Sequence, residues 1–206
     1  MFRSTALSPV LAVPIALIVT GFTDVTAHAG VKVSEKFETY RISGDSGEAL
    51  MGAMDRGGPR HGFLARAIAQ TRYSVAWDIG YKADDDKVCK VTTANVKLSV
   101  SYRFPELAGK PSASMKRSWA KFMTGVRKHE RMHGRIARQM AASAQKAVSS
   151  VSVANDNNCR KAKREVTRVV KAAYDVYEAR QARFDAIEHQ PGGTVDRLVT
   201  AFIRRR

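Results

Sequence analysis

The chain has 206 residues, and its 35 Lys and Arg against 19 Asp and Glu give a formal net charge of +16 at pH 7. This length suits one domain with a real core, and the charge favours anionic partners without specifying a fold. We expect such partners to be anionic envelope polymers or a membrane surface. Aromatic residues do not alternate with the basic runs as base stacking requires, so we expect no nucleic-acid partner.

The first 29 residues are typical of a secretory signal peptide. Arg3 precedes an apolar run over residues 11–19, and Ala27 to Ala29 form an A-x-A cleavage site. The run is too short for a comfortable transmembrane helix, although an uncleaved anchor is the alternative. We therefore expect a secreted or periplasmic protein that begins near Gly30. Its domain should span residues 30–192, followed by a basic tail over residues 193–206.

The first half of this domain, residues 30–110, shows strand patterns and one short helix. Residues 31–42 are expected to be extended, with Phe37, Tyr40 and Ile42 buried. A helix capped by Ser46 should follow and end at residues 57–59, Gly-Gly-Pro.

Two further strands are predicted by alternation of apolar and polar residues, over residues 73–81 and 95–104. An acidic turn, Asp84 to Asp86, connects them, and Pro105 should end the second strand. This half should therefore form a small antiparallel sheet with one apolar face.

The second half, residues 111–190, is predicted to form two long helices. The first should be capped by Ser112 or Ser114 and run to Ser149, and the second should run from Cys159 to Glu188. With a short connection they should lie antiparallel and cover the sheet, which predicts an α+β fold. The tail from Val195 is expected to form a basic amphipathic helix that either contacts anionic surfaces or docks on the domain.

The first long helix carries the motif H-E-x-x-H at residues 129–133. Residues four apart share a helix face, so His129 and His133 can bind one metal ion while Glu130 serves as general base for a bound water. Both histidines continue the apolar stripe of this helix, which predicts that they face the interior. The alternative is two buried histidines that only hydrogen-bond in the core.

Cys89 and Cys159 are the two cysteines of the chain. An even pair in an exported protein favours a disulfide, although two free buried thiols are the alternative. Closing a loop of about 71 residues would stabilise the fold by roughly 4 kcal/mol. Neither cysteine belongs to a C-x-x-C pair, so we do not expect a thiolate zinc site.

The order of these landmarks over residues 38–192 resembles the bacterial DUF922 family, described as predicted secreted zinc-dependent proteases. The matching segments are residues 39–44, 73–77, Cys89, Trp119, 128–133, Cys159 and 184–189. This chain differs from the family's Y-D-x-x-T-x-H-G pattern, because Phe184 stands in place of the tyrosine. The resemblance implies a zinc metallopeptidase with Zn²⁺ as cofactor and a protein or peptide as substrate.

A catalytic zinc site needs a third protein ligand, and His189 or Glu178 could supply it. The resemblance favours His189. If the turn between two straight helices is centred near Ala154, however, His189 overshoots the motif by about 18 Å and Glu178 lies near the opposite position. If the helix continues to His189, Asp185 lies one turn before it and could orient its ring.

The predicted mechanism is metal-assisted peptide hydrolysis, with Tyr73, Tyr174 or Tyr177 as candidates to stabilise the oxyanion. The competing hypothesis is a non-catalytic, basic cell-envelope binding or scaffold protein with a vestigial or structural metal site. In that case Glu130 would only form surface ion pairs with neighbouring arginines.

Overall fold

The computed structural model describes residues 30–61 and 65–204, so the expected signal peptide lies outside the described residues. Within this part, every helix is too short or too polar to cross a membrane. The elements follow in the order β1 Val31–Ile42, α1 Gly47–Gly57, β2 Arg60–His61, β3 Ala65–Arg66, β4 Gln70–Ala83, β5 Cys89–Leu107, α2 Ala113–Ser149, β6 Ser152–Val153, α3 Arg160–His189 and α4 Thr194–Ile203.

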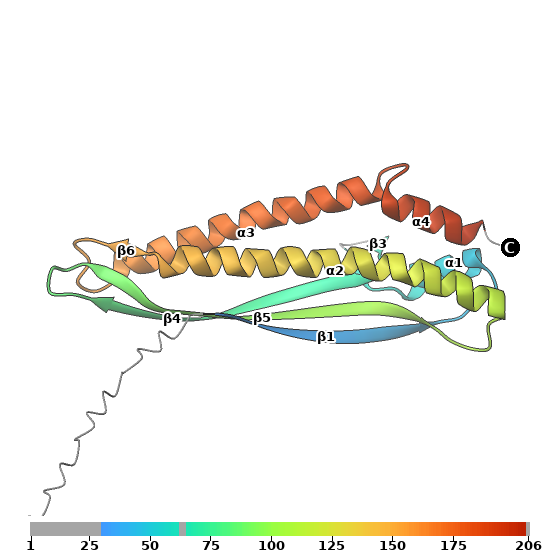
Figure 1. Cartoon of the computed structure of the whole chain (residues 1–206), viewed down its shortest axis with the longest axis horizontal. Helices are drawn as coiled ribbons and strands as arrows, with labels where there is room; N and C mark the ends of the chain where they lie inside the picture. Colours follow the sequence, from blue (N-terminus) through green and yellow to red (C-terminus); the bar gives the residue numbers. More distant parts are fainter. Residues whose placement is uncertain (1–29, 62–64, 205–206) are drawn as a thin grey trace, which may run out of the picture.

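The molecule is elongated, with a long narrow sheet, α2 along one face of it, and α3 running back along α2 (Figure 1). Strands β1, β5 and β4 lie in that order, and the short β6 pairs with the start of β5. The α+β class and both long helices are therefore confirmed. The predicted cap of α2 is also confirmed, because the Ser112 hydroxyl accepts a hydrogen bond from the Met115 amide at 3.2 Å.

The sheet is mixed, so the prediction of an antiparallel sheet is wrong for one strand pair. β4 and β5 form the expected antiparallel hairpin, whereas β1 runs parallel to β5, with Val31 opposite Val96 and Phe37 opposite Tyr102. Alternation shows which face of a strand is buried and does not encode its direction. A long crossover through α1 and β4 separates β1 from β5, which permits the parallel pairing.

Two details of the strand predictions are also wrong. β5 continues through Pro105 to Leu107, because β4 pairs with β5 only as far as Arg103 and leaves an open edge where proline is tolerated. Phe37 stacks on Tyr102 at a ring-centroid distance of 5.1 Å but is 54% exposed, because β1 lies at the edge of the sheet. Tyr40 and Ile42 are buried as expected.

Helix α2 packs against β5 through its apolar stripe. Phe122, Val126, Ile136 and Met140 are all buried. Gly134 also lies on this face, where any side chain would overlap the Tyr102 hydroxyl. The missing side chain therefore lets the helix approach the sheet closely beside the H-E-x-x-H motif.

Helix α3 is buried mainly near its start. Ala162 and Val166 are its buried residues, whereas Ile187, near its other end, is 49% exposed. The helix packs mainly on α2 and contributes little to covering the sheet, so its buried stripe is short.

Both ends of α3 are fastened to the rest of the domain. The predicted disulfide between Cys89 and Cys159 is present, with a Cα–Cα distance of 5.3 Å, and joins the start of β5 to the start of α3. Beyond α3, α4 docks on the domain, where Phe202 is buried and stacks on Phe122 at 4.3 Å between ring centroids. The C-terminal tail thus belongs to the main hydrophobic core.

Candidate metal centre

The two motif histidines lie on the face of α2 that meets α3. Their side chains are 10% exposed for His129 and 14% exposed for His133, which confirms that they face the interior. A helix places residues four apart on one face, and the two Nε2 atoms accordingly approach each other to 3.2 Å.

Asp185 on α3 completes a compact triangle with these two nitrogens. Its Oδ1 lies 2.9 Å from His133 Nε2 and 3.3 Å from His129 Nε2. Ligands about 2.0–2.1 Å from a tetrahedral zinc ion are separated by about 3.3 Å. The three atoms therefore have the spacing of donors on one face of a zinc coordination sphere.

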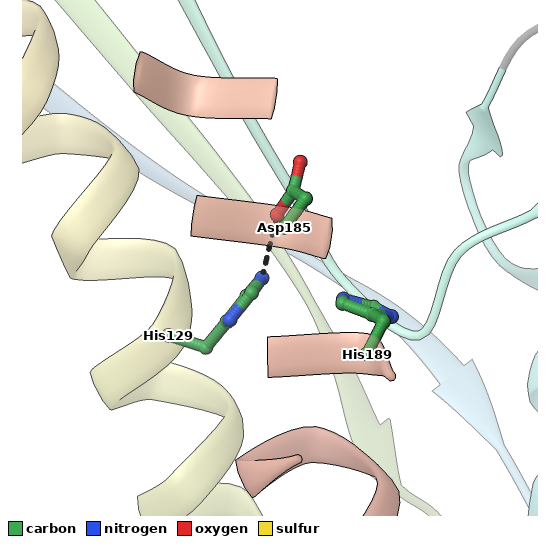
Figure 2. A group of neighbouring side chains, drawn as sticks. All are labelled: His129, Asp185 and His189. Carbon is green, nitrogen blue, oxygen red and sulfur yellow. Dashed lines mark ion pairs between the residues drawn. The ribbon is translucent and has the colours of Figure 1, made fainter. Parts of the chain in front are cut away.

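His189, at the last residue of α3, lies beside this triangle. Single donor atoms of His129, Asp185 and His189 all fall within 4.8 Å of one another, and Figure 2 shows the three side chains converging from the two helices. The rings of His129 and His189 are 5.2 Å apart between centroids. His189 is thus close enough to contribute a further donor.

The predicted overshoot of His189 past the motif does not occur, because the turn between α2 and α3 is not centred at Ala154. His133 faces Gln181 and Ser143 faces Tyr177, which places the midpoint between the paired residues at 157–160 instead of 154. The connection pairs with β5 through β6 and is tied down at Cys159. This shift brings the end of α3 to the motif.

Glu178, the alternative third ligand, is not part of this group. It lies seven residues before Asp185 on α3, or about 10 Å along the helix axis. Its carboxylate accepts a hydrogen bond from the Tyr73 hydroxyl, and this contact contributes with burial to raising the pKa of Tyr73.

Gln181 and Phe184 hold the imidazole rings in place. Gln181 accepts a hydrogen bond from His133 Nδ1 at 2.6 Å and donates to the His133 carbonyl at 3.2 Å, so Nε2 is left to face Asp185. The Phe184 ring stacks on His129 at 4.9 Å between centroids. A neutral imidazole oriented through its second nitrogen is the usual form of a metal-binding histidine.

The electrostatics of the group reflect the meeting of a carboxylate with three imidazoles. Burial alone would raise the pKa of Asp185, but hydrogen bonds from His129 and His133 hold that pKa far below its ordinary value. Burial likewise lowers the pKa of His133, yet the hydrogen bonds to Asp185 and Gln181 outweigh burial and raise it. Burial and the nearby His129 lower the pKa of His189, which favours its neutral form.

Glu130 is buried, with 7% of its surface exposed. Its Oε2 accepts a hydrogen bond from the Thr71 hydroxyl on β4 at 2.6 Å. Among the residues described, it forms no ion pair with Arg127, Arg131 or Arg135. The hypothesis that Glu130 only forms surface ion pairs is therefore wrong.

A cavity of about 840 Å³ opens in front of the group, bounded by α1, the start of β4, α2, α3 and α4. The motif residues His129, Glu130 and His133 line it together with Asp185 and His189. Of the three tyrosines considered for the oxyanion, Tyr73 lines this cavity. The Tyr177 hydroxyl instead forms a hydrogen bond with the Ser143 hydroxyl, and Tyr174 forms a side-chain hydrogen bond with Trp77.

One buried atom of the site has no hydrogen-bond partner. His129 Nδ1 is shielded from solvent, and the nearest carboxylate oxygen, Glu188 Oε2, lies 3.7 Å away. Gln181 takes the proton on His133 Nδ1, so with both imidazoles neutral at most one hydrogen lies between the two Nε2 atoms and Asp185 Oδ1. If the His129 proton lies on Nδ1, all three of these atoms present lone pairs to the same space, and the donor set fits a metal ion.

Sequence reasoning treated Asp185 only as an orienting residue and missed Gln181 and Thr71. The spacing of Asp185 and His189 was visible, because it repeats the four-residue interval of His129 and His133 on a second helix. Gln181 and Thr71 belong to no motif, and only the packing of α3 and β4 against α2 identifies them.

A family model described as a bacterial protein of unknown function, DUF922, matches residues 37–193. The chain belongs to the DUF922 family. That description names no activity, and α4 lies beyond the matched residues. No curated protein and no solved structure gives a significant match to this DUF922 chain.

Proposed function

We propose that the chain is a secreted or periplasmic zinc metalloprotease, with the metal held by His129, His133 and Asp185 and with His189 as a further donor. The observation that carries this proposal is the triangle of two imidazole nitrogens and one carboxylate oxygen, separated by 2.9–3.3 Å. Imidazole and carboxylate donors at this spacing suit Zn²⁺.

Zinc, when bound, would lower the pKa of a coordinated water and polarise the substrate carbonyl. Glu130 supports the accompanying proton transfers because it lines the same cavity and its Oε2 is fixed by Thr71. In this position Glu130 accepts the proton of the attacking water and passes it to the leaving amine. Burial protects this exchange from competing solvent.

The edge strand beside the cavity suits an extended peptide. β4 is an edge strand of the sheet, beyond which no further strand lies in the described chain, and Gln70, Thr71 and Tyr73 at its start line the cavity. An edge strand offers backbone hydrogen bonds to an incoming peptide. This arrangement supports a peptide substrate over a small molecule.

The test compares wild type with Glu130→Gln, which preserves size but cannot accept a proton at neutral pH. We expect zinc content and melting temperature near wild type, with hydrolysis of a mixed peptide library reduced by about 10²-fold or more. Glu165→Gln, an exposed carboxylate paired with Arg168, is the control and should remain fully active.

Hydrolysis should also disappear with a chelator and return with added zinc. Activity retained in Glu130→Gln would remove this residue from the mechanism. Zinc-loaded wild type that cleaves no peptide in the library would favour the alternative of a non-catalytic envelope protein with a structural metal site.

A further inference from the structure

Charge is strongly segregated between the surface of this protein and its cavity. The chain as a whole has a net charge of +16. Of the residues that the structure describes, one arginine, Arg66, lines the cavity, together with five carboxylates, those of Asp55, Glu130, Glu178, Asp185 and Asp196. A cleft lined by one sign of charge focuses its field on the ligand that enters.

A bound metal ion and the contacts within the fold would offset only part of this negative charge. A divalent ion and Arg66 together offset three of the five negative charges. Glu130 and Asp185 belong to the metal centre, and Asp196 accepts a hydrogen bond from the Gly192 amide at 2.9 Å. Asp55 on α1 and Glu178 on α3 therefore remain, on different elements that border one cavity.

Both of these carboxylates can receive a cation. Asp55 is exposed and has no ion-pair partner among the residues that the structure describes. Glu178 accepts the Tyr73 hydroxyl through Oε1, which leaves Oε2 to accept a further donor. Neither side chain is needed to close the metal triangle.

We propose that this cavity binds cationic peptide segments, with a lysine or arginine side chain held by Glu178 and further attracted by the negative charge of Asp55 on the cavity wall. The proposal rests on the proposed function, because it names the substrate class of the same site. Glu178 lies about 10 Å from Asp185 along α3, which equals about three residues of extended peptide. The selected side chain therefore lies two or three residues from the scissile bond.

The net charge of the protein alone predicts a preference for anionic peptides, which is the opposite of the preference proposed for the cavity. A protein of net charge +16 attracts anionic peptides and repels cationic ones at long range. At about 0.15 M salt this long-range effect is screened beyond about 8 Å, while contacts inside the cavity persist. A preference for lysine can therefore arise only from local carboxylates.

The experiment measures the affinity of three fluorescent peptides that differ at one position, which is lysine, norleucine or glutamate. Binding to zinc-loaded Glu130→Gln protein is followed by anisotropy at about 0.15 M salt, so that no cleavage intervenes. We expect the lysine peptide to bind about tenfold more tightly than the norleucine peptide, as one charge-assisted contact provides. The glutamate peptide should bind most weakly.

Matched variants locate the effect. The pair Asp55→Asn and Glu178→Gln should abolish the preference for lysine, and each alone should reduce it. Asp175→Asn is the control, because Asp175 lies one turn from Glu178 on α3, pairs with Lys171 at 2.6 Å and does not line the cavity. All three side chains are exposed, so the substitutions should leave folding intact.

Equal affinity for the lysine and norleucine peptides, or tighter binding of the glutamate peptide, overturns the inference. A preference for lysine that survives in the double variant also overturns it. Failure of the proposed function looks different. In that case wild type selects the lysine peptide without cleaving it, whereas cleavage without charge preference removes only the present inference.

Discussion

Gly134 provides a direct test of how the fold positions the metal centre. It follows His133 on α2, and a Cβ at this position would overlap the Tyr102 hydroxyl and lie 3.0 Å from the Tyr102 Cζ. Tyr102 is 1% exposed, and its hydroxyl donates a hydrogen bond to Glu35 at 2.9 Å. The ring therefore has no room to move away, and Gly134→Ala should force α2 off the sheet.

The expected magnitude follows from three opposing effects. Alanine gains about 1 kcal/mol of helix propensity over glycine. Overpacking costs about 1–3 kcal/mol, and loss of a hydrogen bond to a charged acceptor costs about 1.5–3 kcal/mol. Gly134→Ala should therefore reduce the free energy of unfolding by about 3 kcal/mol, which lowers the melting temperature of a domain of this size by about 6–12 °C.

Urea denaturation of four proteins gives the measurement: wild type, Gly134→Ala, Tyr102→Phe and the double variant. Tyr102→Phe removes the overlapping oxygen, so the double variant should be less destabilised than the sum of the two single variants. Gly52→Ala on α1 is the control, because its Cβ would meet only the Arg56 guanidinium of an exposed side chain, at 3.2 Å. A Gly134→Ala protein as stable as wild type, or one not rescued by Tyr102→Phe, would refute the reasoning.

The remaining predictions concern the disulfide and the metal centre. Reduction of Cys89–Cys159 should lower the free energy of unfolding by about 4 kcal/mol, and an unchanged denaturation midpoint under reducing conditions would contradict this. Asp185→Asn should weaken zinc binding by more than about 100-fold, which exceeds the loss expected for a residue that only supports a ligand. Unaltered zinc affinity would exclude Asp185 as a ligand. The zinc affinity of His189→Ala, measured alongside, shows whether His189 contributes equally. Thr71→Val should leave zinc affinity unchanged and reduce hydrolysis about tenfold by releasing Glu130, and full activity in this variant would refute that positioning role.

The elements could be predicted because each carries its own periodicity. The alternating residues of β5 and the apolar stripe of α2 are both buried where the pattern indicated. The direction of β1 could not be predicted, since parallel and antiparallel pairing bury the same face. Phe37 was misplaced for a related reason, because alternation does not show that β1 lies at the edge of the sheet.

Which residue of α3 lies opposite the H-E-x-x-H motif depends on the register between α2 and α3, and the periodicity of each helix does not encode that register. When the centre of a turn moves by some number of residues, the residue opposite a fixed position moves by twice that number. A shift from Ala154 to residues 157–160 therefore moves the residue opposite His129 by about 6–12 positions, which decides between Glu178 and His189. β6 and the disulfide hold the connection against β5, and neither the pairing of β6 nor its length can be inferred from the sequence of the connection itself.

We expect the position of Asp185 to depend also on α4, which lies beyond the residues that match the family model. The buried residues of α3 are near its start, and its far half is held to α2 by partly exposed contacts, such as those of Gln181 with His133. That end continues through Gly192 and Gly193 into α4, where Phe202 stacks on Phe122 of α2. Phe202 thus fastens the end of α3 to the helix that carries His129.

Phe202→Ala should consequently affect two properties at once. Loss of a buried phenylalanine lowers the free energy of unfolding by about 3–5 kcal/mol, and release of α4 should weaken zinc binding about tenfold, within the range found when support for a ligand is removed. Ile187→Ala is the matched control, because Ile187 lies on the same end of α3 and is 49% exposed. Zinc titration and denaturation of both variants provide the measurement. If Phe202→Ala remains folded and binds zinc as tightly as wild type, α3 holds Asp185 in place without α4.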